Sequence, residues 1–149
     1  MRALSRLVAL VVAASAAERA ALGEEAASEV EIVADRVEYD REAGRAEFQG
    51  GVQLRHGQVE LECDRMVVEM GAEGRLVTVV ASGHVRVRGR GFDASAGAAR
   101  YEPAAGRVLL SDDPRVTASA GELRGRTIVV SLGDGRLSVE RARGVFRVH

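Results

Sequence analysis

A repeat of about thirty residues constrains this chain more than any other feature of its sequence. Each copy begins with a Gly-Arg pair, and successive pairs lie 30, 32 and 29 residues apart. The four pairs are Gly44-Arg45, Gly74-Arg75, Gly106-Arg107 and Gly135-Arg136. A second series of glycines, Gly57, Gly89 and Gly121, repeats every 32 residues. Such periods are typical of stacked units that bury their apolar faces against one another.

From Val30 onward, apolar and polar residues alternate with a period of two. Val52 and Leu54 flank Gln53, and the same pattern recurs through Val59 to Asp64, Val85 to Arg88 and Ile128 to Leu132. This alternation is typical of antiparallel strands with one apolar and one solvated face. The sequence therefore predicts an all-β domain.

The predicted strands would run about 11 to 13 residues between turns, longer than the usual five or six. Near the middle of most of these strands lie residues that disfavour a regular, flat hydrogen-bonded strand. These are Gly50-Gly51, Ser82-Gly83, Asp113-Pro114, Gly125 and Gly144. Such residues permit a bend, so that one strand can begin in one sheet and finish in a facing sheet. We expect two sheets in a V, enclosing a long apolar slot.

The N-terminal segment has the layout of an export signal. Arg2 and Arg6 precede an apolar run from Leu7 to Ala17, and Ala14-Ser15-Ala16 offers a small-residue cleavage site. The run is too short to span a bilayer, which needs about 20 residues. We predict a signal peptide over residues 1–16, a loose tether over 17–29 and a single domain over 30–149. An uncleaved anchor is the alternative.

Charge and composition exclude several classes of function. The formal net charge of −1 argues against nucleic acid binding, which favours strongly basic domains. All 21 basic residues are Arg, which coding bias explains as well as function does. The lone Cys63 excludes an internal disulfide and a cysteine-based metal site, and it is read as a small apolar residue facing inward.

The sequence contains no recognisable catalytic or metal-binding motif. His56 and His84 lie at a turn and a strand break, His149 is the last residue, and none has a metal-ligand spacing. The carboxylate pair Asp112-Asp113 directly precedes Pro114 and is read as turn chemistry. We expect no enzyme, no cofactor and no metal site.

Six motifs, in order along residues 30–148, resemble the LptA/OstA family. They are Ala34-Asp35-Arg36-Val37-Glu38-Tyr39-Asp40, Phe48-Gln49-Gly50-Gly51-Val52-Gln53-Leu54, Glu62-Cys63-Asp64-Arg65-Met66-Val67-Val68, Ala81-Ser82-Gly83-His84-Val85-Arg86-Val87, Ala99-Arg100-Tyr101 and Ile128-Val129-Val130. The family often has Gly-Asn-Val at the mid-strand break and Gly-x-Pro in the third repeat. This chain instead has Gly50-Gly51-Val52, Gly83-His84-Val85 and Asp112-Asp113-Pro114.

The resemblance implies an open antiparallel β-jellyroll of about four two-strand rungs. It also implies a periplasmic lipopolysaccharide carrier that shields lipid A acyl chains in an apolar groove. The candidate lining residues are Val30, Ile32, Val37, Tyr39, Phe48, Val52, Leu54, Leu61, Met66, Val68, Val85, Val87, Phe92, Tyr101 and Val116. Val30, Ile32 and Tyr101 match positions that the family uses for cargo contact. Each lining residue could equally fill a dry core.

Three arginines are candidates for contacting lipid phosphates. Arg86, Arg88 and Arg90 alternate with inward valines and would face outward or lie at a rim. Arginine can bind phosphate with two parallel hydrogen bonds. The alternative is an ordinary solvated face, balanced by outward Glu60, Glu62 and Asp64.

The two ends of the predicted stack differ, which bears on partners. A first strand near Val30–Ala34 and a last strand near Gly144–Val148 would each have unpaired backbone groups. Pairing of first to last would be head-to-tail and would not close. It would give a homo-oligomer, or a bridge to inner- and outer-membrane components of similar fold. The alternatives are a structural β-solenoid polymer without lipid, and the membrane-anchored sister component of the same transport system.

Overall fold

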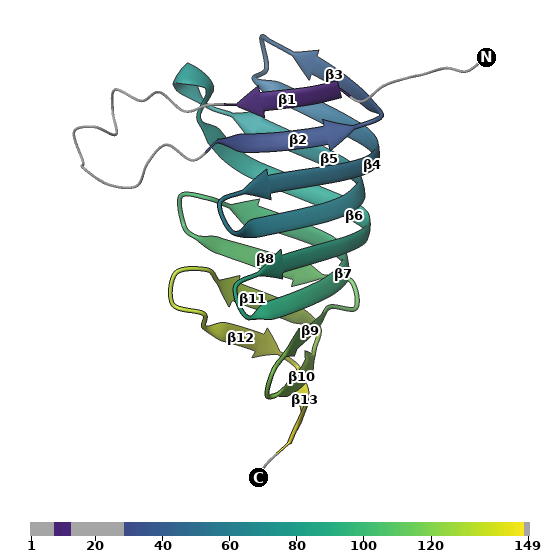
Figure 1. Ribbon diagram of the computed structural model, residues 1–149, viewed down its shortest axis with the longest axis vertical. Coiled ribbons are helices and arrows are strands. Elements are labelled where there is room, and N and C mark those ends of the chain that lie inside the picture. Colours follow the sequence, from purple (N-terminus) through teal and green to yellow (C-terminus); the bar gives the residue numbers. More distant parts are fainter. Residues whose placement is uncertain (1–7, 13–28, 148–149) are drawn as a thin grey trace.

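The computed structural model describes residues 8–12 and 29–147, which form strands, turns and one short 3-10 helix (Figure 1). The elements are β1 Val8–Val12, β2 Val30–Ala34, β3 Arg36–Asp40, β4 Arg45–His56, β5 Val59–Met70, η1 Ala72–Gly74, β6 Leu76–Gly89, β7 Phe92–Glu102, β8 Arg107–Ser111, β9 Arg115–Ala118, β10 Gly121–Arg124, β11 Thr127–Ser131, β12 Leu137–Glu140 and β13 Arg143–Phe146. Every strand pairing is antiparallel, and the sheet does not close. The predicted open all-β architecture is confirmed.

The sheet folds over itself into two facing layers because its long strands bend midway. The first layer contains β2, the second half of β4, the first half of β5, the second half of β6, the first half of β7, and then β9, β10 and β13. The second layer contains β3, the other halves of β4 to β7, and then β8, β11 and β12. The layers are joined at one lateral edge, which we call the closed edge, and end in turns at the opposite, open edge (Figure 1).

At the closed edge, the strands bend at β-bulges whose backbone adopts a positive φ, the conformation that glycine favours. Gly50 and Gly51 of β4 stand opposite the single residue Asp64 of β5, and both have positive φ, 85° and 54°. The same geometry recurs in β6, where φ is 82° at Gly83 and 49° at His84. Because the left-handed region admits Gly and, among other residues, tolerates Asn, Asp and His best, the second position of the bulge can be Gly or His.

An aspartate covers the glycine at three of these corners. A Cβ added to Gly50 would lie 2.6 Å from Oδ2 of Asp35, and one added to Gly83 would lie 2.6 Å from Oδ2 of Asp64. Gly97 is covered in the same way by Asp112, whose backbone oxygen also accepts a hydrogen bond from the Gly97 amide at 2.8 Å. The predicted turn at Asp112-Asp113 is present, with φ of 66° and 62°.

The Gly-Arg repeat marks the open edge of the second layer. All four of its glycines adopt positive φ, which glycine reaches without steric cost. Each pair immediately precedes or begins a strand, namely β4, β6, β8 and β12. Each Gly-Arg pair therefore marks a turn that joins two neighbouring strands of the second layer. The predicted break at Gly144 is wrong: this residue lies inside β13, and the chain changes layer before it, near Arg141, where φ is 57°.

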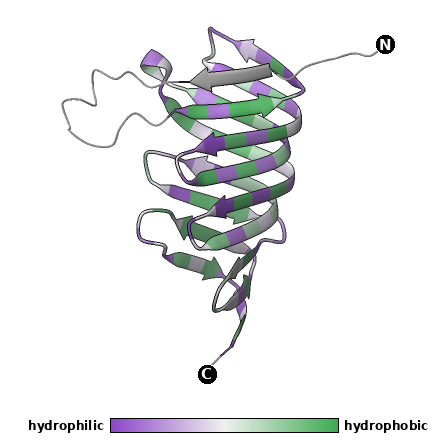
Figure 2. Ribbon diagram, in the orientation of Figure 1, coloured by the Kyte–Doolittle hydropathy of each residue, from purple (hydrophilic) through white to green (hydrophobic). Residues whose placement is uncertain are grey.

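The core lies between the layers and is built from one face of every long strand. Apolar and polar residues alternate along the strands in Figure 2. Burial follows this alternation, with Ile32, Phe48, Met66, Val87 and Leu110 having no exposed surface. Twenty-six buried apolar residues form a single cluster, so the interior is continuous along the stack.

The N-terminal edge of the first layer is not free in this chain. β1 pairs with β2 over five residues, from Val8 opposite Ala34 to Val12 opposite Val30. The prediction of an unpaired first strand at Val30–Ala34 is therefore wrong while residues 8–12 are present. Most of the predicted signal segment and the tether up to residue 28 lie outside the described residues. Within the described ranges, no helix is long and apolar enough to cross a membrane.

Candidate functional site

The open edge contains a hollow of about 720 Å³ between turns of the two layers. In the first layer it is bounded by the β4–β5 turn and the β6–β7 turn. In the second layer it is bounded by Tyr101 and by the β11–β12 turn from Ser131 to Leu137. Its apolar wall is formed by Val59, Phe92, Tyr101, Ala118, Val130, Leu132 and Leu137. Its volume lies in the range of small-ligand sites, and its wall combines these apolar side chains with polar and backbone groups of the turns.

A hydrogen bond between His56 and Tyr101 connects the two layers at the N-terminal border of this hollow. His56 ends β4 in the first layer, and Tyr101 lies on β7 in the second layer. Nδ1 of His56 and the Tyr101 hydroxyl are 2.8 Å apart, and the rings meet edge to face with centroids 5.9 Å apart. Both side chains line the hollow.

Burial favours the neutral form of both members of this pair. Loss of solvation lowers the pKa of His56 below 6.5, and burial raises the pKa of Tyr101 to about 12. The neutral imidazole and the phenol are hydrogen-bond partners of each other. A buried tyrosine hydroxyl needs such a partner because an unsatisfied one is costly.

The structure gathers most of the predicted lining residues in the interior between the layers. Twelve of them are buried: Val30, Ile32, Phe48, Val52, Leu54, Leu61, Met66, Val68, Val85, Val87, Tyr101 and Val116. Ten of the twelve lie within strands β2 to β6, where the facing side chains fill the space between layers. Of the fifteen candidates, Phe92 and Tyr101 line the hollow.

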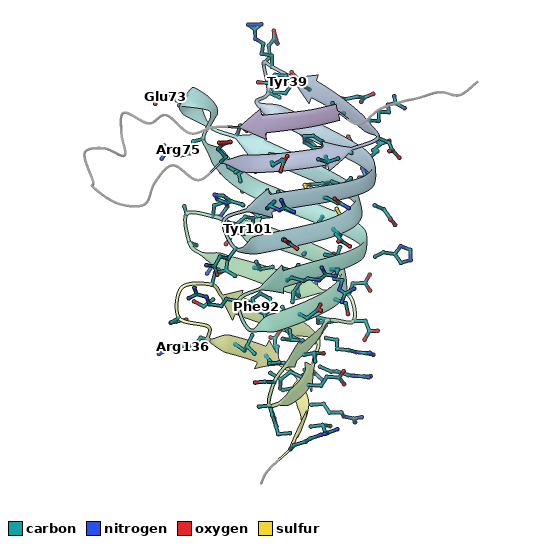
Figure 3. All side chains as sticks on the ribbon, in the orientation of Figure 1. Tyr39, Glu73, Arg75, Phe92, Tyr101 and Arg136 are labelled. Atoms are coloured by element: carbon teal, nitrogen blue, oxygen red, sulfur yellow. The ribbon has the colours of Figure 1, made fainter. Side chains whose placement is uncertain are left out.

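Tyr39 does not lie in the interior. Its side chain is 57% exposed, and Figure 3 shows it at the N-terminal end of the stack, away from Phe92 and Tyr101. It lies on β3, which pairs only with β4 and is therefore the last strand of the second layer. Val37, on the same strand, is only partly buried and packs against the edge of the core. The sequence of the strand alternates as predicted, but in the structure only Val37 is partly buried and the other four residues of β3 are exposed.

Several residues of the hollow were not identified from the sequence. His56, Val130, Leu132 and Leu137 line it but were not among the candidate lining residues. A signal for Leu137 was present, since it directly follows the last Gly-Arg pair and so begins a strand at the open edge. Nothing in the spacing of His56 and Tyr101, which are 45 residues apart, indicates that they meet.

The three candidate phosphate-binding arginines occupy two different environments. Arg86 donates two hydrogen bonds to Asp93, at 3.1 and 2.8 Å, and these bonds hold the pKa of the Asp93 carboxyl below its usual value. Arg88 lies 3.9 Å from carboxylate oxygens of both Glu60 and Asp93. These two side chains belong to a ladder of ion pairs on the outer face. Arg90, in contrast, lies in the β6–β7 turn at the border of the hollow.

Cys63 behaves as a buried apolar residue. Its thiol donates a hydrogen bond to the Arg65 carbonyl at 3.2 Å, and burial raises its pKa to about 12. A thiol with such a pKa is a poor nucleophile and a poor metal ligand near neutral pH. Within residues 29–147, no group of three or more His, Cys, Asp or Glu side chains could hold a metal ion.

Comparison with known proteins agrees with this architecture. Residues 31–136, well over half of the chain, match the family described as LptA/(LptD N-terminal domain) LPS transport protein. Among solved structures the chain is similar to LptH, described as the LptA homologous periplasmic component of the conserved lipopolysaccharide transport device from Pseudomonas aeruginosa. The TM-score is 0.74 and the identity 18%, and the alignment covers 80% of this chain and 95% of that one. This likeness shows a shared fold. No curated protein sequence gives a significant match.

Proposed function

Because this chain belongs to the LptA and LptD N-terminal domain family of lipopolysaccharide transport proteins, we propose that it is a periplasmic carrier of lipopolysaccharide. It holds the acyl chains of lipid A between its two layers and passes them along the stack. The observation that carries this proposal is a continuous apolar interior, closed along one lateral edge and hollowed at the other.

The energetics of acyl burial suit a carrier. Burying a chain of about 12 carbons gains on the order of 9 kcal/mol, at about 0.8 kcal/mol per CH₂. A membrane offers nearly the same gain, so an apolar interior without strong polar contacts can accept a chain and release it again. The interior here is lined mainly by Val, Leu, Ile, Phe, Met and Ala side chains. Among the described residues its buried polar groups include Thr78, the Cys63 thiol and the Tyr101 hydroxyl, and the last two have hydrogen-bond partners.

The hollow is the proposed place of entry from the side. Phe92 and Tyr101 face it from opposite layers, and Arg90 lies at its border. An acyl chain entering here would leave its polar head near Arg90, which can contact a phosphate, whereas Arg86 and Arg88 are engaged with carboxylates. Of the three arginines, we therefore assign the phosphate contact to Arg90.

Cross-linking in cells tests the carrier proposal. A photoreactive phenylalanine analogue replaces Phe92 in one variant and Tyr39 in a control, since Tyr39 is aromatic, exposed and at the N-terminal end. After irradiation in a lipopolysaccharide-producing cell, we expect an adduct of lipopolysaccharide size at position 92 and little at position 39. Equal labelling at both positions would indicate surface adsorption. The absence of an adduct at position 92 would reject the carrier.

We further propose that the carrier stacks head to tail and so bridges partners in the two membranes. The C-terminal end presents β13, on which Val145 and Phe146 are 66% and 54% exposed. At the other end β1 pairs with β2, and a partner strand would take its place after removal of residues 1–16. This predicts that the chain lacking residues 1–16 forms larger assemblies than the full chain, as measured by analytical ultracentrifugation. Equal masses for the two chains would contradict it.

A further inference from the structure

The His56–Tyr101 contact differs from the other hydrogen bonds between side chains in the part of the chain that the structure describes. Pairs such as Arg86 with Asp93 and Arg107 with Glu102 join neighbouring strands on the outer, solvated face. The His56–Tyr101 bond instead crosses the interior from one layer to the other at the open edge, where the backbone does not connect them. Among the side-chain hydrogen bonds of residues 29–147, it is the one that joins the two layers at the open edge.

The bond also lies at a boundary in packing. On its C-terminal side is the hollow of about 720 Å³. On its N-terminal side the interior is filled, since Val30, opposite His56 on β2, is 3% exposed and Val79, opposite Tyr101 on β6, has no exposed surface. An acyl chain that enters the hollow and moves toward the N-terminal half must pass between His56 and Tyr101.

We propose that the His56–Tyr101 hydrogen bond is a latch between the two layers, and that it must open for an acyl chain to pass from the hollow into the N-terminal interior. The inference rests on the proposed carrier function and adds to it a residue pair that limits the rate of passage. A neutral pair suits this role because one hydrogen bond between uncharged groups is weak enough to break and reform thermally. Its loss would not leave a buried charge.

The chain carries its own reporter for passage. Cys63 is its lone cysteine and lies in the interior of the N-terminal half. The inward row Val59, Leu61 and Cys63 runs along β5 from the turn beside His56 to the corner at the closed edge. A thiol reagent with a long alkyl tail must follow this row to reach the sulfur from the hollow.

The test compares the full chain with Tyr101→Phe, which keeps the ring and removes the hydroxyl. Dodecyl methanethiosulfonate reports alkyl access to Cys63, and the cationic reagent 2-(trimethylammonium)ethyl methanethiosulfonate, which an apolar path excludes, reports general opening of the fold to water. Both reagents react with the thiolate, so the high pKa of Cys63 slows both alike, and each rate is compared between variants at one alkaline pH. We expect Tyr101→Phe to accelerate modification by the dodecyl reagent about fivefold, the factor that corresponds to one hydrogen bond, with little change for the cationic reagent. His56→Leu should behave in the same way. His56→Asn, which keeps a polar atom near the position of Nδ1, should restore a slower rate.

The outcomes separate the latch from simple destabilisation and from the carrier proposal itself. An equal acceleration for both reagents would mean that the bond only stabilises the fold, and this would overturn the latch. Unchanged dodecyl rates in both Tyr101→Phe and His56→Leu would overturn it as well. Binding of a dansyl-labelled undecanoic acid to the unmodified chain is measured in parallel. Absence of that binding contradicts the carrier, whereas equal binding in all variants with unchanged Cys63 rates contradicts only the latch.

Discussion

The two lateral edges of the molecule join the two layers in different ways. At the closed edge the backbone itself passes from one layer to the other through bulges with positive φ, and aspartates pack directly on the glycines. At the open edge the strands end in turns, and the His56–Tyr101 hydrogen bond joins the layers. The closed edge is fixed by backbone geometry and the open edge by side chains.

This difference determines where the fold tolerates change. Gly50 and Gly83 at the corners are constrained both by a positive φ and by a neighbouring aspartate, which an added Cβ would meet at under 3 Å. A turn glycine of the open edge, such as Gly57, has positive φ but nothing within 4 Å of an added Cβ. Under the proposed carrier function, the interior would open at the open edge, where side-chain contacts that can break and reform hold the layers together.

The largest expected effect contrasts glycines of the two edges. Gly83→Ala places a Cβ 2.9 Å from Cβ of Asp64 at a residue with φ of 82°, so backbone strain and overpacking add. We expect it to lower the free energy of unfolding by about 3 kcal/mol. Gly57→Ala meets only the cost of the left-handed conformation, about 1 kcal/mol. Urea denaturation monitored by circular dichroism measures both.

A double mutant separates the two contributions at the corner. Asp64→Gly removes the atoms that the new Cβ would meet, so adding it to Gly83→Ala should recover the steric part of the loss and leave the strain. Equal losses for Gly83→Ala and Gly57→Ala would show that the corner aspartate adds nothing. In that case the closed edge would be no more constrained than the open one.

Much of this architecture is predictable from the sequence because it follows from local rules. Alternation around Val52 and Val85 identifies the inward faces, and the glycine pairs identify the bends, since both depend on a few consecutive residues. The prediction at Gly144 is wrong for a local reason: the chain changes layer near Arg141, a residue other than glycine that has a positive φ. Local sequence signals thus predict the strands better than they predict the position at which the chain changes layer.

The candidate site is less predictable because it depends on which strands face each other across the interior. Tyr39 has the same alternation as the buried residues, yet it lies on the last strand of the second layer and its side chain is exposed. His56 and Tyr101 meet because β4 ends in the first layer while the second half of β7 lies in the other. Their encounter needs the whole stack between residues 56 and 101 to be in register, and the sequence does not display that relation.

The smallest expected effect contrasts the histidines of the two edges. His84, at the closed edge, is exposed to solvent, and its Nδ1 lies 2.8 Å from Oδ2 of Asp64. The hydrogen bond to Asp64 and the charge of that carboxylate raise the pKa of His84 above 6.5. His56, at the open edge, has its pKa lowered below 6.5 by loss of solvation. A histidine titration by NMR should therefore give the order His56 below His84.

The two shifts act on stability with opposite signs. The raised pKa of His84 contributes stability that is present below pH 6.5 and is lost as the pH rises through its folded value. The lowered pKa of His56 contributes stability that is present above pH 6.5 and is lost as the pH falls through its folded value. Between about pH 8 and pH 5, His84→Asn should therefore steepen the loss of stability on acidification, and His56→Asn should flatten it. Because His84 is exposed to solvent that screens its partner, its effect should be the smaller of the two. A larger effect for His84→Asn would mean that the charge at the closed edge, and not the desolvated pair at the open edge, governs the response of this fold to pH.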